Sequence, residues 1–292
     1  MGLWIPFTLF AAFMQSWRNA FQSQLSKEVS TAGVTLARFI YASPLAVLYL
    51  VVLYQVSPAP LPTVTTKLSV MIILASVSQI VATALMVKLF QLRNYAIGVG
   101  LAKSEAIIAA TLGALFFAAP LNMLAWVGVI VGGIAVWLMS AAGSFKTLSW
   151  RTVLLGVGSG LAFALTTLWV REASLILALP FPHGAAWVLV AVISLQTLML
   201  LAWIGWREPE TLHALYQRPK KTFLISLCSC LGSLGWFTAM SLETVALVKT
   251  LGQVEVLFTL LISARFFKDA LAPRDLLGLG LIVAGAVCVI IA

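Results

Sequence analysis

The passages KLFQLRNYAIGVGLAKSEAII at Lys88–Ile108 and TAMSLETVALVKTLGQVEVLF at Thr238–Phe258 match without a gap and decide the fold. A single offset aligns these identical pairs: Leu92 with Leu242, Ala96 with Ala246, Glu105 with Glu255, Phe13 with Phe163, Ser76 with Ser226, Phe117 with Phe267 and Gly128 with Gly278. The chain therefore reads as an internal duplication that carries one acidic residue at the same place in each half.

The composition places this duplicated chain in a membrane. Apolar residues make up 62% of it and charged residues 9%, whereas soluble domains are about 45–50% apolar and about 25% charged. A soluble fold could not keep so much apolar surface out of water. The net charge of +9 comes from cations in short predicted loops, and no basic run is interleaved with aromatics. We therefore expect membrane lipid, and no nucleic acid, among the partners.

Ten stretches are long and apolar enough to cross a bilayer, which takes about 20 residues. They are 3–25, 32–54, 68–90, 95–117, 123–142, 152–172, 185–206, 222–242, 245–266 and 275–292. Breaks such as Ser57–Pro62 separate them, because proline cannot continue a helix. Five spans per half is an odd number, so the halves must cross in opposite senses. The predicted fold is an all-α membrane protein of ten transmembrane helices, arranged as two inverted five-helix repeats at 1–145 and 146–292. Such folds bind substrate where the repeats meet, near the bilayer midplane.

The distribution of Lys and Arg predicts the orientation, since cytoplasmic loops are enriched in both. Loops after even-numbered spans hold only Lys67 and Arg171. Loops after odd-numbered spans hold Lys27, Arg93, Lys146, Arg151, Arg207, Arg218, Lys220, Lys221, Arg265, Lys268 and Arg274. We therefore expect the odd-numbered loops in the cytoplasm and both termini on the outer side of a cell inner membrane.

Small residues recur where helices must approach closely. The patterns Gly128-xxx-Gly132 and Gly156-xxx-Gly160 favour close backbone contact in lipid, and we interpret them as contacts within a monomer rather than a dimer interface. Cys228-x-Cys230 lies among serines and is interpreted as a packing stripe. His183 and His213 lie in predicted loops without ligand partners, so the sequence predicts no metal site and no cofactor.

Charged residues inside apolar spans are the best candidates for function, because a charge at the bilayer centre costs at least about 2.5–3.5 kcal/mol. They are Arg18, Arg38, Lys88, Lys103, Glu105, Lys249 and Glu255. At 100° per residue, Lys103 and Glu105 lie on nearly opposite faces of one helix, whereas Lys249 and Gln253 share a face. We expect Lys103, Lys249 and Gln253 to line a central cavity. Two interpretations of Glu105 and Glu255 stay open: a proton-coupling site, or structural partners of Arg18 and Arg38.

Other side chains extend the candidate site. Gln79 is bulky and costly in lipid, so we expect it in the cavity. Trp17, Trp169 and Trp236 either stack on substrate or belong to the aromatic belts at the membrane interfaces. Serines of the predicted eighth span, at 226, 229 and 233, are either polar groups of the cavity or hydrogen-bonding contacts between helices, and we favour the second interpretation.

Three passages resemble a known family: FTAMSLETVAL at Phe237–Leu247, FKDALAPRDLLGLGLIVAG at Phe267–Gly285, and Arg38-Phe39. They are similar to the drug/metabolite transporter superfamily and in particular to its EamA-type exporters, over essentially the whole chain. The resemblance implies a central cavity lined mainly by spans three, four, eight and nine. It also implies export of amino acids, other small metabolites or drugs, often in exchange with protons. Amino-acid exporters of the YddG kind are the nearest analogy.

Several residues depart from the family pattern. Asp269 stands where Glu is usual, and Ala118-Ala119-Pro120 replaces the acidic turn in the first half. The proline common in spans four and nine is absent, and charges at both Lys103 and Glu105 are unusual. The family also implies cytoplasmic termini, which conflicts with the loop charges.

The favoured hypothesis is a secondary transporter that exports a small-molecule substrate, such as an amino acid, by alternating access, and that works as a monomer. An alternative is a drug or nucleotide/sugar-type carrier of the same superfamily. An intramembrane enzyme is disfavoured because the sequence has no HExxH or GxSxG motif. A channel would need a continuous polar stripe, whereas the polar residues here cluster in the middle of each repeat.

Overall fold

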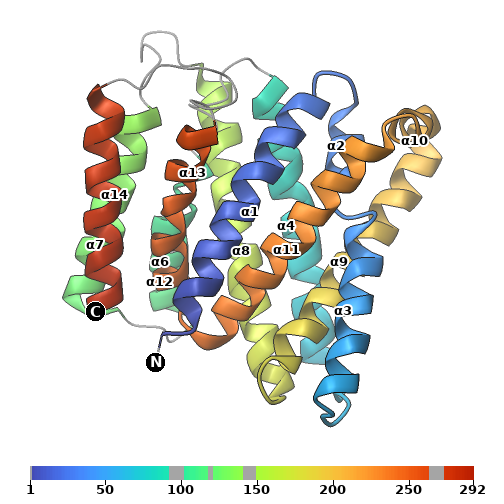
Figure 1. Cartoon of the computed structure of the whole chain (residues 1–292), viewed down its shortest axis with the longest axis horizontal. Helices are drawn as coiled ribbons and strands as arrows, with labels where there is room; N and C mark the ends of the chain where they lie inside the picture. The colour runs from blue at the N-terminus through green and yellow to red at the C-terminus, as the bar shows by residue number, and fades with distance from the viewer. Residues whose placement is uncertain (1, 92–101, 118–120, 141–148, 263–272) are drawn as a thin grey trace.

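The computed structural model describes residues 2–91, 102–117, 121–140, 149–262 and 273–292. Every regular element in these ranges is a helix, and the helices form one bundle with both termini near the same end (Figure 1). Several predicted features fall outside the described residues, namely Arg93, Lys146, Arg265, Lys268, Asp269 and the Ala118–Pro120 turn.

The first half of the chain contains α1 (Trp4–Leu25), α2 (Thr31–Ala37), α3 (Ala42–Val56), α4 (Thr66–Gln91), α6 (Glu105–Phe116) and α7 (Met123–Ser140). The second half contains α8 (Trp150–Leu177), α9 (His183–Arg207), α10 (Pro209–Tyr216), α11 (Pro219–Leu242), α12 (Val245–Leu251), the 3₁₀ turn η2 (Gly252–Val254), α13 (Glu255–Ile262) and α14 (Pro273–Ile291). Each predicted span therefore contains helix, while α10 is a short helix in a segment that the sequence predicted as a loop.

Six helical stretches are long and apolar enough to cross a membrane by length and composition: 31–56, 66–91, 150–177, 183–207, 219–242 and 245–262. Shorter apolar helices lie at 105–116, 123–138 and 277–291. The chain is thus a multi-pass membrane protein, and the count of ten crossings stays a prediction. Helix α1 is missing from both groups, because polar residues such as Gln15, Arg18 and Asn19 interrupt its apolar sequence.

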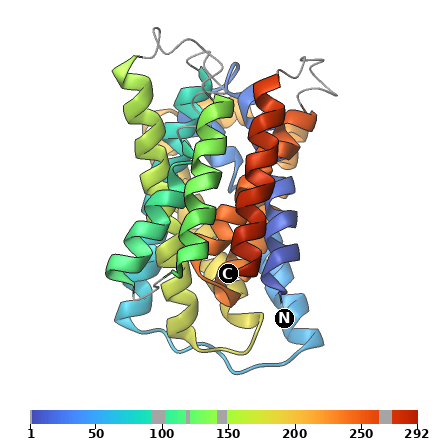
Figure 2. The ribbon, with the colours of Figure 1, turned by 90° about the vertical axis from the view of Figure 1, so that its left-hand side faces the viewer.

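The helices pack in pairs that link the two halves. Helix α4 packs on α8, α1 on α11, α7 on α14, and α3 on α9, as Figures 1 and 2 show. Glycines make the α7–α14 contact close, since a Cβ on Gly128 would lie 2.9 Å from the carbonyl oxygen of Gly285. The pattern at Gly128 and Gly132 therefore serves packing within one chain, as the sequence indicated.

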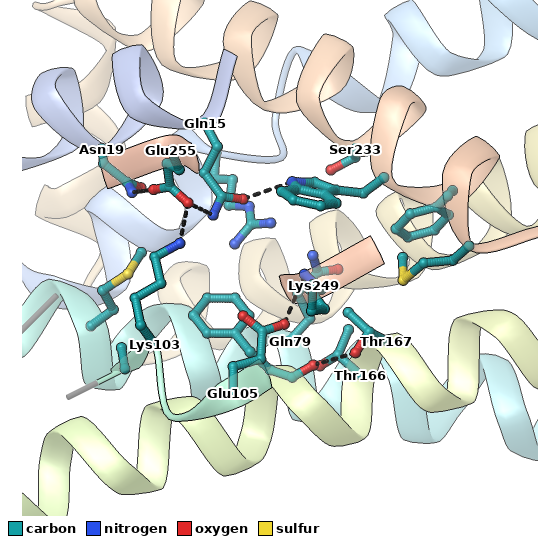
Figure 3. Close-up of a pocket in the computed structure, with 17 residues that line it drawn as sticks. Gln15, Asn19, Gln79, Lys103, Glu105, Thr166, Thr167, Ser233, Lys249 and Glu255 are labelled. Carbon is teal, nitrogen blue, oxygen red and sulfur yellow. Dashed lines mark hydrogen bonds and ion pairs between the residues drawn. The ribbon is translucent and has the colours of Figure 1, made fainter. Parts of the chain in front are cut away.

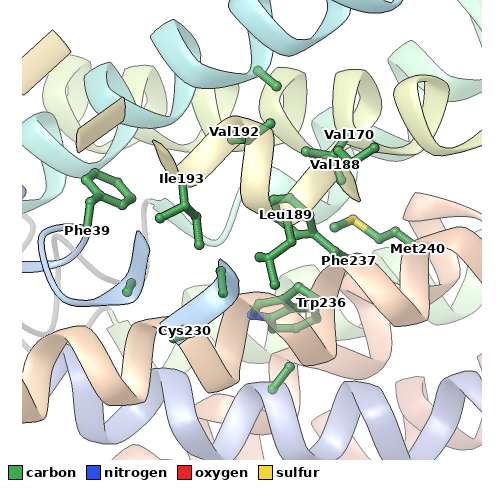
Figure 4. Close-up of a cluster of buried hydrophobic side chains, with 14 of the residues drawn as sticks. Phe39, Val170, Val188, Leu189, Val192, Ile193, Cys230, Trp236, Phe237 and Met240 are labelled. Carbon is green, nitrogen blue, oxygen red and sulfur yellow. The ribbon is translucent and has the colours of Figure 1, made fainter. Parts of the chain in front are cut away.

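The main hydrophobic core lies where α8, α9 and α11 meet the segment after α2. Leu189 and Ile193 of α9 pack there with Phe39 and Met240, all of them fully buried (Figure 4). Polar side chains are buried beside this core, and Gln196 of α9 donates to Gln79 of α4 at 2.7 Å. Burial of a polar group is unfavourable unless it has a hydrogen-bond partner, and this contact gives each of the two side chains one partner.

Different contacts lie at the two ends of the bundle. At the end that carries α10, Glu28 pairs with Arg218 at 2.7 Å and with Lys221 at 2.6 Å. At the opposite end, near both termini, His183 contacts the carbonyl oxygen of Ser57 at 2.7 Å. We call these the α10 end and the terminal end. The predicted loop cations Lys27, Arg207, Arg218, Lys220 and Lys221 adjoin the α10 end.

Candidate functional site

A polar cavity lies in the middle of the bundle (Figure 3). It has a volume of about 30 Å³, which is room for about two water molecules. Its lining comes from both halves of the chain: Gln15, Asn19, Arg38, Gln79, Met86, Ala102, Lys103, Glu105, Phe163, Thr166, Thr167, Ser233, Trp236, Phe237, Met240, Lys249 and Glu255.

Two ion pairs cross between the halves at this cavity. Lys103 pairs with Glu255, and Lys249 Nζ lies 2.7 Å from Glu105 Oε1. Each glutamate is therefore neutralised by a lysine of the other half. The two pairs hold two positive and two negative charges in the bundle interior, where an unpaired charge would be strongly unfavourable.

Glu255 is held by more donors than Glu105. Besides Lys103, it accepts hydrogen bonds from Gln15 Nε2 at 2.6 Å and from Asn19 Nδ2 at 2.8 Å. Gln15 in turn accepts from Trp236 Nε1 at 2.9 Å. Glu255 thus ties α13 to α1 and α11, whereas the described contact of the Glu105 carboxylate is with Lys249 alone.

The arginines take other roles than the direct partnership considered from the sequence. Arg38 donates to Thr83 Oγ1 at 2.6 Å and to Ser229 Oγ at 3.2 Å, so it joins three helices at the cavity edge. Arg18 donates to Asn19 Oδ1 at 2.8 Å, and Asn19 in turn donates a hydrogen bond to Glu255. The ion pairs described for the two glutamates are with Lys103 and Lys249, each across the repeat interface.

Helix breaks explain why Lys103 and Glu105 both reach the cavity. Lys103 and Ser104 form a turn before α6 begins at Glu105, and η2 interrupts the second half before α13 begins at Glu255. The sequence-based prediction placed Lys103 and Glu105 on opposite faces because it assumed a continuous helix, and the turn makes that assumption wrong. Each glutamate lies in the first turn of its helix, where the helix dipole favours negative charge.

Gln253 lies beside the central cavity, in a smaller one that it shares with Lys103, Trp236 and Lys249. Its side chain is 1% exposed, and neither amide atom has a hydrogen-bond partner in the described part of the chain. A Cβ on Gly132 would overlap this amide, so the glycine leaves room for it. A buried amide without partners is unfavourable, which makes Gln253 a group available to a ligand.

Of the remaining predicted residues, some line the central cavity and others do not. Trp236 lines the cavity with its ring 4.2 Å from Lys249 Nζ, and Gln79 lines it as well. Trp17 lies beside Phe21 with ring centroids 5.7 Å apart, and Trp169 meets Phe117 at 5.4 Å. Neither of these two tryptophans is among the lining residues, so the structure places them at aromatic contacts elsewhere.

Sequence reasoning missed Gln15 and Asn19 of α1 and Thr166 and Thr167 of α8. A signal was present, since Gln15 and Asn19 are four residues apart and share one helix face. Across the described ranges, no group of three or more His, Cys, Asp or Glu side chains is arranged to hold a metal ion.

Comparison with known proteins agrees with this architecture. A solved structure titled "Crystal structure of protein" aligns over 97% of this chain and 96% of its own length, with a TM-score of 0.69 and 13% sequence identity. That likeness shows a shared fold alone. No curated protein matches the chain. Residues 150–291 match the family model described as EamA-like transporter family, so the second half of the chain is an EamA-type domain of the drug/metabolite transporter superfamily.

Proposed function

We propose that this membrane transporter exports amino acids across the bacterial inner membrane by alternating access. The observation that carries the proposal is the exchanged pairing of Lys103 with Glu255 and of Lys249 with Glu105. An amino acid carries one carboxylate and one ammonium group. Its carboxylate can replace a glutamate beside a lysine while its ammonium replaces a lysine beside a glutamate. The buried charges then stay neutralised throughout the exchange, which a substrate of a single charge would not achieve.

The helix contacts support an arrangement as two inverted five-helix repeats at 1–145 and 146–292. Under the repeat alignment, α1 corresponds to α8 and α4 corresponds to α11. The alignment therefore predicts that a contact between α4 and α8 is matched by a contact between α11 and α1. Both contacts are present. Helix α1 begins at the terminal end and α8 finishes there, since Phe7 and Phe181 lie 6.3 Å apart. Corresponding helices therefore run in opposite directions, as an inverted repeat requires.

The matched helix breaks support a moving central site. Transporters of inverted-repeat design bind substrate at interrupted helices near the bilayer midplane, and here the breaks at Ser104 and at η2 flank both glutamates. The small central cavity corresponds to a conformation in which the ion pairs close the site. Opening on either side requires one repeat to tilt against the other and the lysine–glutamate pairs to exchange partners.

We further propose that the α10 end is cytoplasmic, that the termini are external, and that the monomer is the functional unit. The cations adjoining the α10 end support the orientation. The residues assigned to the substrate are Lys103, Lys249, Gln253, Gln79 and Trp236, with Glu105 and Glu255 as their charge partners.

Transport by purified protein in proteoliposomes tests the function. A panel of labelled amino acids, nucleotide sugars and lipophilic cations is offered with and without a pH gradient, and empty liposomes serve as the control. The proposal expects saturable uptake of one or more neutral amino acids. Transport of a nucleotide sugar or a lipophilic cation, with no amino acid moved, would instead assign the alternative carrier function.

A further inference from the structure

A second and larger cavity lies between the central site and the terminal end. It has a volume of about 290 Å³, against about 30 Å³ for the central one. Its walls come from α6, α8 and α12, three helices that also line the central cavity. Arg171 lies four residues beyond Thr167 on α8, which is about 6 Å along the helix axis. The second cavity therefore stands one helical turn outside the central site.

Charged groups of both signs line this outer cavity. Arg171 and Glu172 both contribute to its wall, and they form no ion pair of 4.0 Å or less with any described residue. Thr244 also lines it, and its hydroxyl oxygen is buried without a hydrogen-bond partner in the parts of the chain that the structure describes. The guanidinium of Arg171, the carboxylate of Glu172 and the hydroxyl of Thr244 thus belong to residues that line one cavity.

The position of the Arg171 guanidinium is held by the end of α11. Its Nη1 donates to the carbonyl oxygen of Met240 at 2.7 Å and to that of Glu243. Among the described contacts, these two bonds are the only ones that Arg171 makes, so the Nε and Nη2 donors remain available. A guanidinium fixed on one edge and free on another is suited to bind a carboxylate through two parallel hydrogen bonds.

We propose that this cavity is an outer binding site, in which a zwitterionic amino acid docks with its carboxylate on Arg171 and its ammonium on Glu172. This inference rests on the proposed amino-acid export. Apart from these charged groups and Thr244, the wall is apolar and includes Phe117 as well as smaller residues such as Ala109 and Val245. The outer site therefore takes amino acids with uncharged, apolar side chains.

The two cavities differ in charge pairing and in size. At the central site the charges are already paired, and the space is too small for an amino acid. At the outer site the charges are unpaired with each other and the space is larger. A substrate leaving toward the terminal end, or approaching from it, occupies the outer site while the central ion pairs are closed.

Transport kinetics measured separately at the two membrane faces test the outer site. Labelled L-leucine is offered to right-side-out and to everted vesicles that contain wild-type protein, Glu172→Gln or Leu175→Trp. Glu172→Gln removes the ammonium partner, and Leu175→Trp narrows the cavity from an exposed rim position. Lys67→Gln, at the same membrane end, and Leu161→Trp, exposed on α8, are matched controls that do not line the cavity.

The expected result with Glu172→Gln is a KM for leucine that rises about tenfold at the terminal face, which corresponds to the loss of one good polar contact. With Leu175→Trp the KM at that face also rises, because the narrower cavity holds leucine less well. The KM at the α10 face, the kcat and both control variants stay near the wild-type values. N-acetyl-L-leucine, which lacks the ammonium charge, should compete poorly against leucine with the wild-type protein and comparatively better with Glu172→Gln.

Three outcomes would contradict the inference in different ways. If the wild-type protein transports leucine or another amino acid of the panel, and the variants keep an unchanged KM at both faces, the outer site is absent and the proposed function stands. If the KM rises equally at both faces, Glu172 is structural. If the wild-type protein transports no amino acid, the proposed function and the outer site fail together.

Discussion

Lys249 Nζ lies 2.7 Å from Glu105 Oε1, so a lysine of the second half neutralises a glutamate of the first half. Both groups are buried, with side-chain exposures of 8% and 9%, so the attraction between their charges is only weakly screened by solvent. The Trp236 ring, 4.2 Å from Lys249 Nζ, provides a second favourable contact for the cation.

Removing one member of this pair should damage both stability and transport. We expect Glu105→Gln or Lys249→Gln to destabilise the protein by about 3–5 kcal/mol, because the remaining buried charge loses its partner. The charge exchange Glu105→Lys with Lys249→Glu should recover a large part of the stability. Thermal unfolding of the purified protein in detergent measures both effects. A double variant no more stable than the single variants would show that the pair is not the relevant interaction.

Gln253→Met should separate ligand binding from folding. Methionine has a similar length and no polar group, so it removes the unpartnered buried amide, whose cost is about 1–3 kcal/mol. We expect stability to be kept or raised while amino-acid uptake in proteoliposomes falls several-fold. Lys103→Ala should also reduce uptake without abolishing membrane insertion. Normal uptake by either variant would remove that residue from the binding site.

Gly252 should tolerate no larger side chain. A Cβ at this position would overlap the Trp236 ring, which itself lines the central cavity. Gly252→Ala should therefore displace Trp236 and lower transport by at least about tenfold, since small misplacements in a site have large effects. Gly205→Ala is the matched control, because a Cβ added at Gly205 would meet no atom within 4 Å, and it should leave transport unchanged. Equal transport by the two variants would contradict this packing argument.

Acid should weaken the contact between the loop after α1 and the start of α11. Hydrogen bonds from Lys221 and then Arg218 hold the pKa of Glu28 below its usual value. A carboxyl with a lowered pKa stabilises the folded state at higher pH, and that stabilisation disappears as the pH falls through the folded-state pKa. The unfolding temperatures of wild-type protein and Glu28→Gln should therefore differ at neutral pH and converge once the pH has fallen below the folded-state pKa of Glu28. A difference that persists in acid would rule out this ionic contribution.

The orientation can be tested with a reporter at the C-terminus. We expect a fusion that fluoresces only in the cytoplasm to remain dark, and a fusion to an enzyme active only outside the cytoplasm to be active. The physical reason is the excess of Lys and Arg adjoining the α10 end. A fluorescent C-terminal fusion would reverse the orientation and would place the outer cavity on the cytoplasmic face.

Much of the architecture was accessible from sequence because lipid imposes strong rules. A helix that crosses a bilayer needs a long apolar run, so stretches such as 68–90 and 222–242 were predicted within a few residues of α4 and α11. Charges such as Lys103, Glu105, Lys249 and Glu255 stood out because apolar spans rarely contain them. The two charged residues of the outer cavity, Arg171 and Glu172, did not stand out, because they lie near the end of α8 and resemble ordinary loop charges.

The sequence by itself indicated the apolar spans, the two repeats and the charges within the spans, since each depends on local composition or on repeated spacing. Only the tertiary structure decided which charges meet. Lys103 and Glu105 both line the same cavity, although the spacing of a continuous helix would place them on nearly opposite faces. The exchange of lysine partners between Glu105 and Glu255 depends on helices brought together from opposite halves of the chain. Contacts between segments so distant in sequence follow from packing of the whole bundle, which no local pattern encodes.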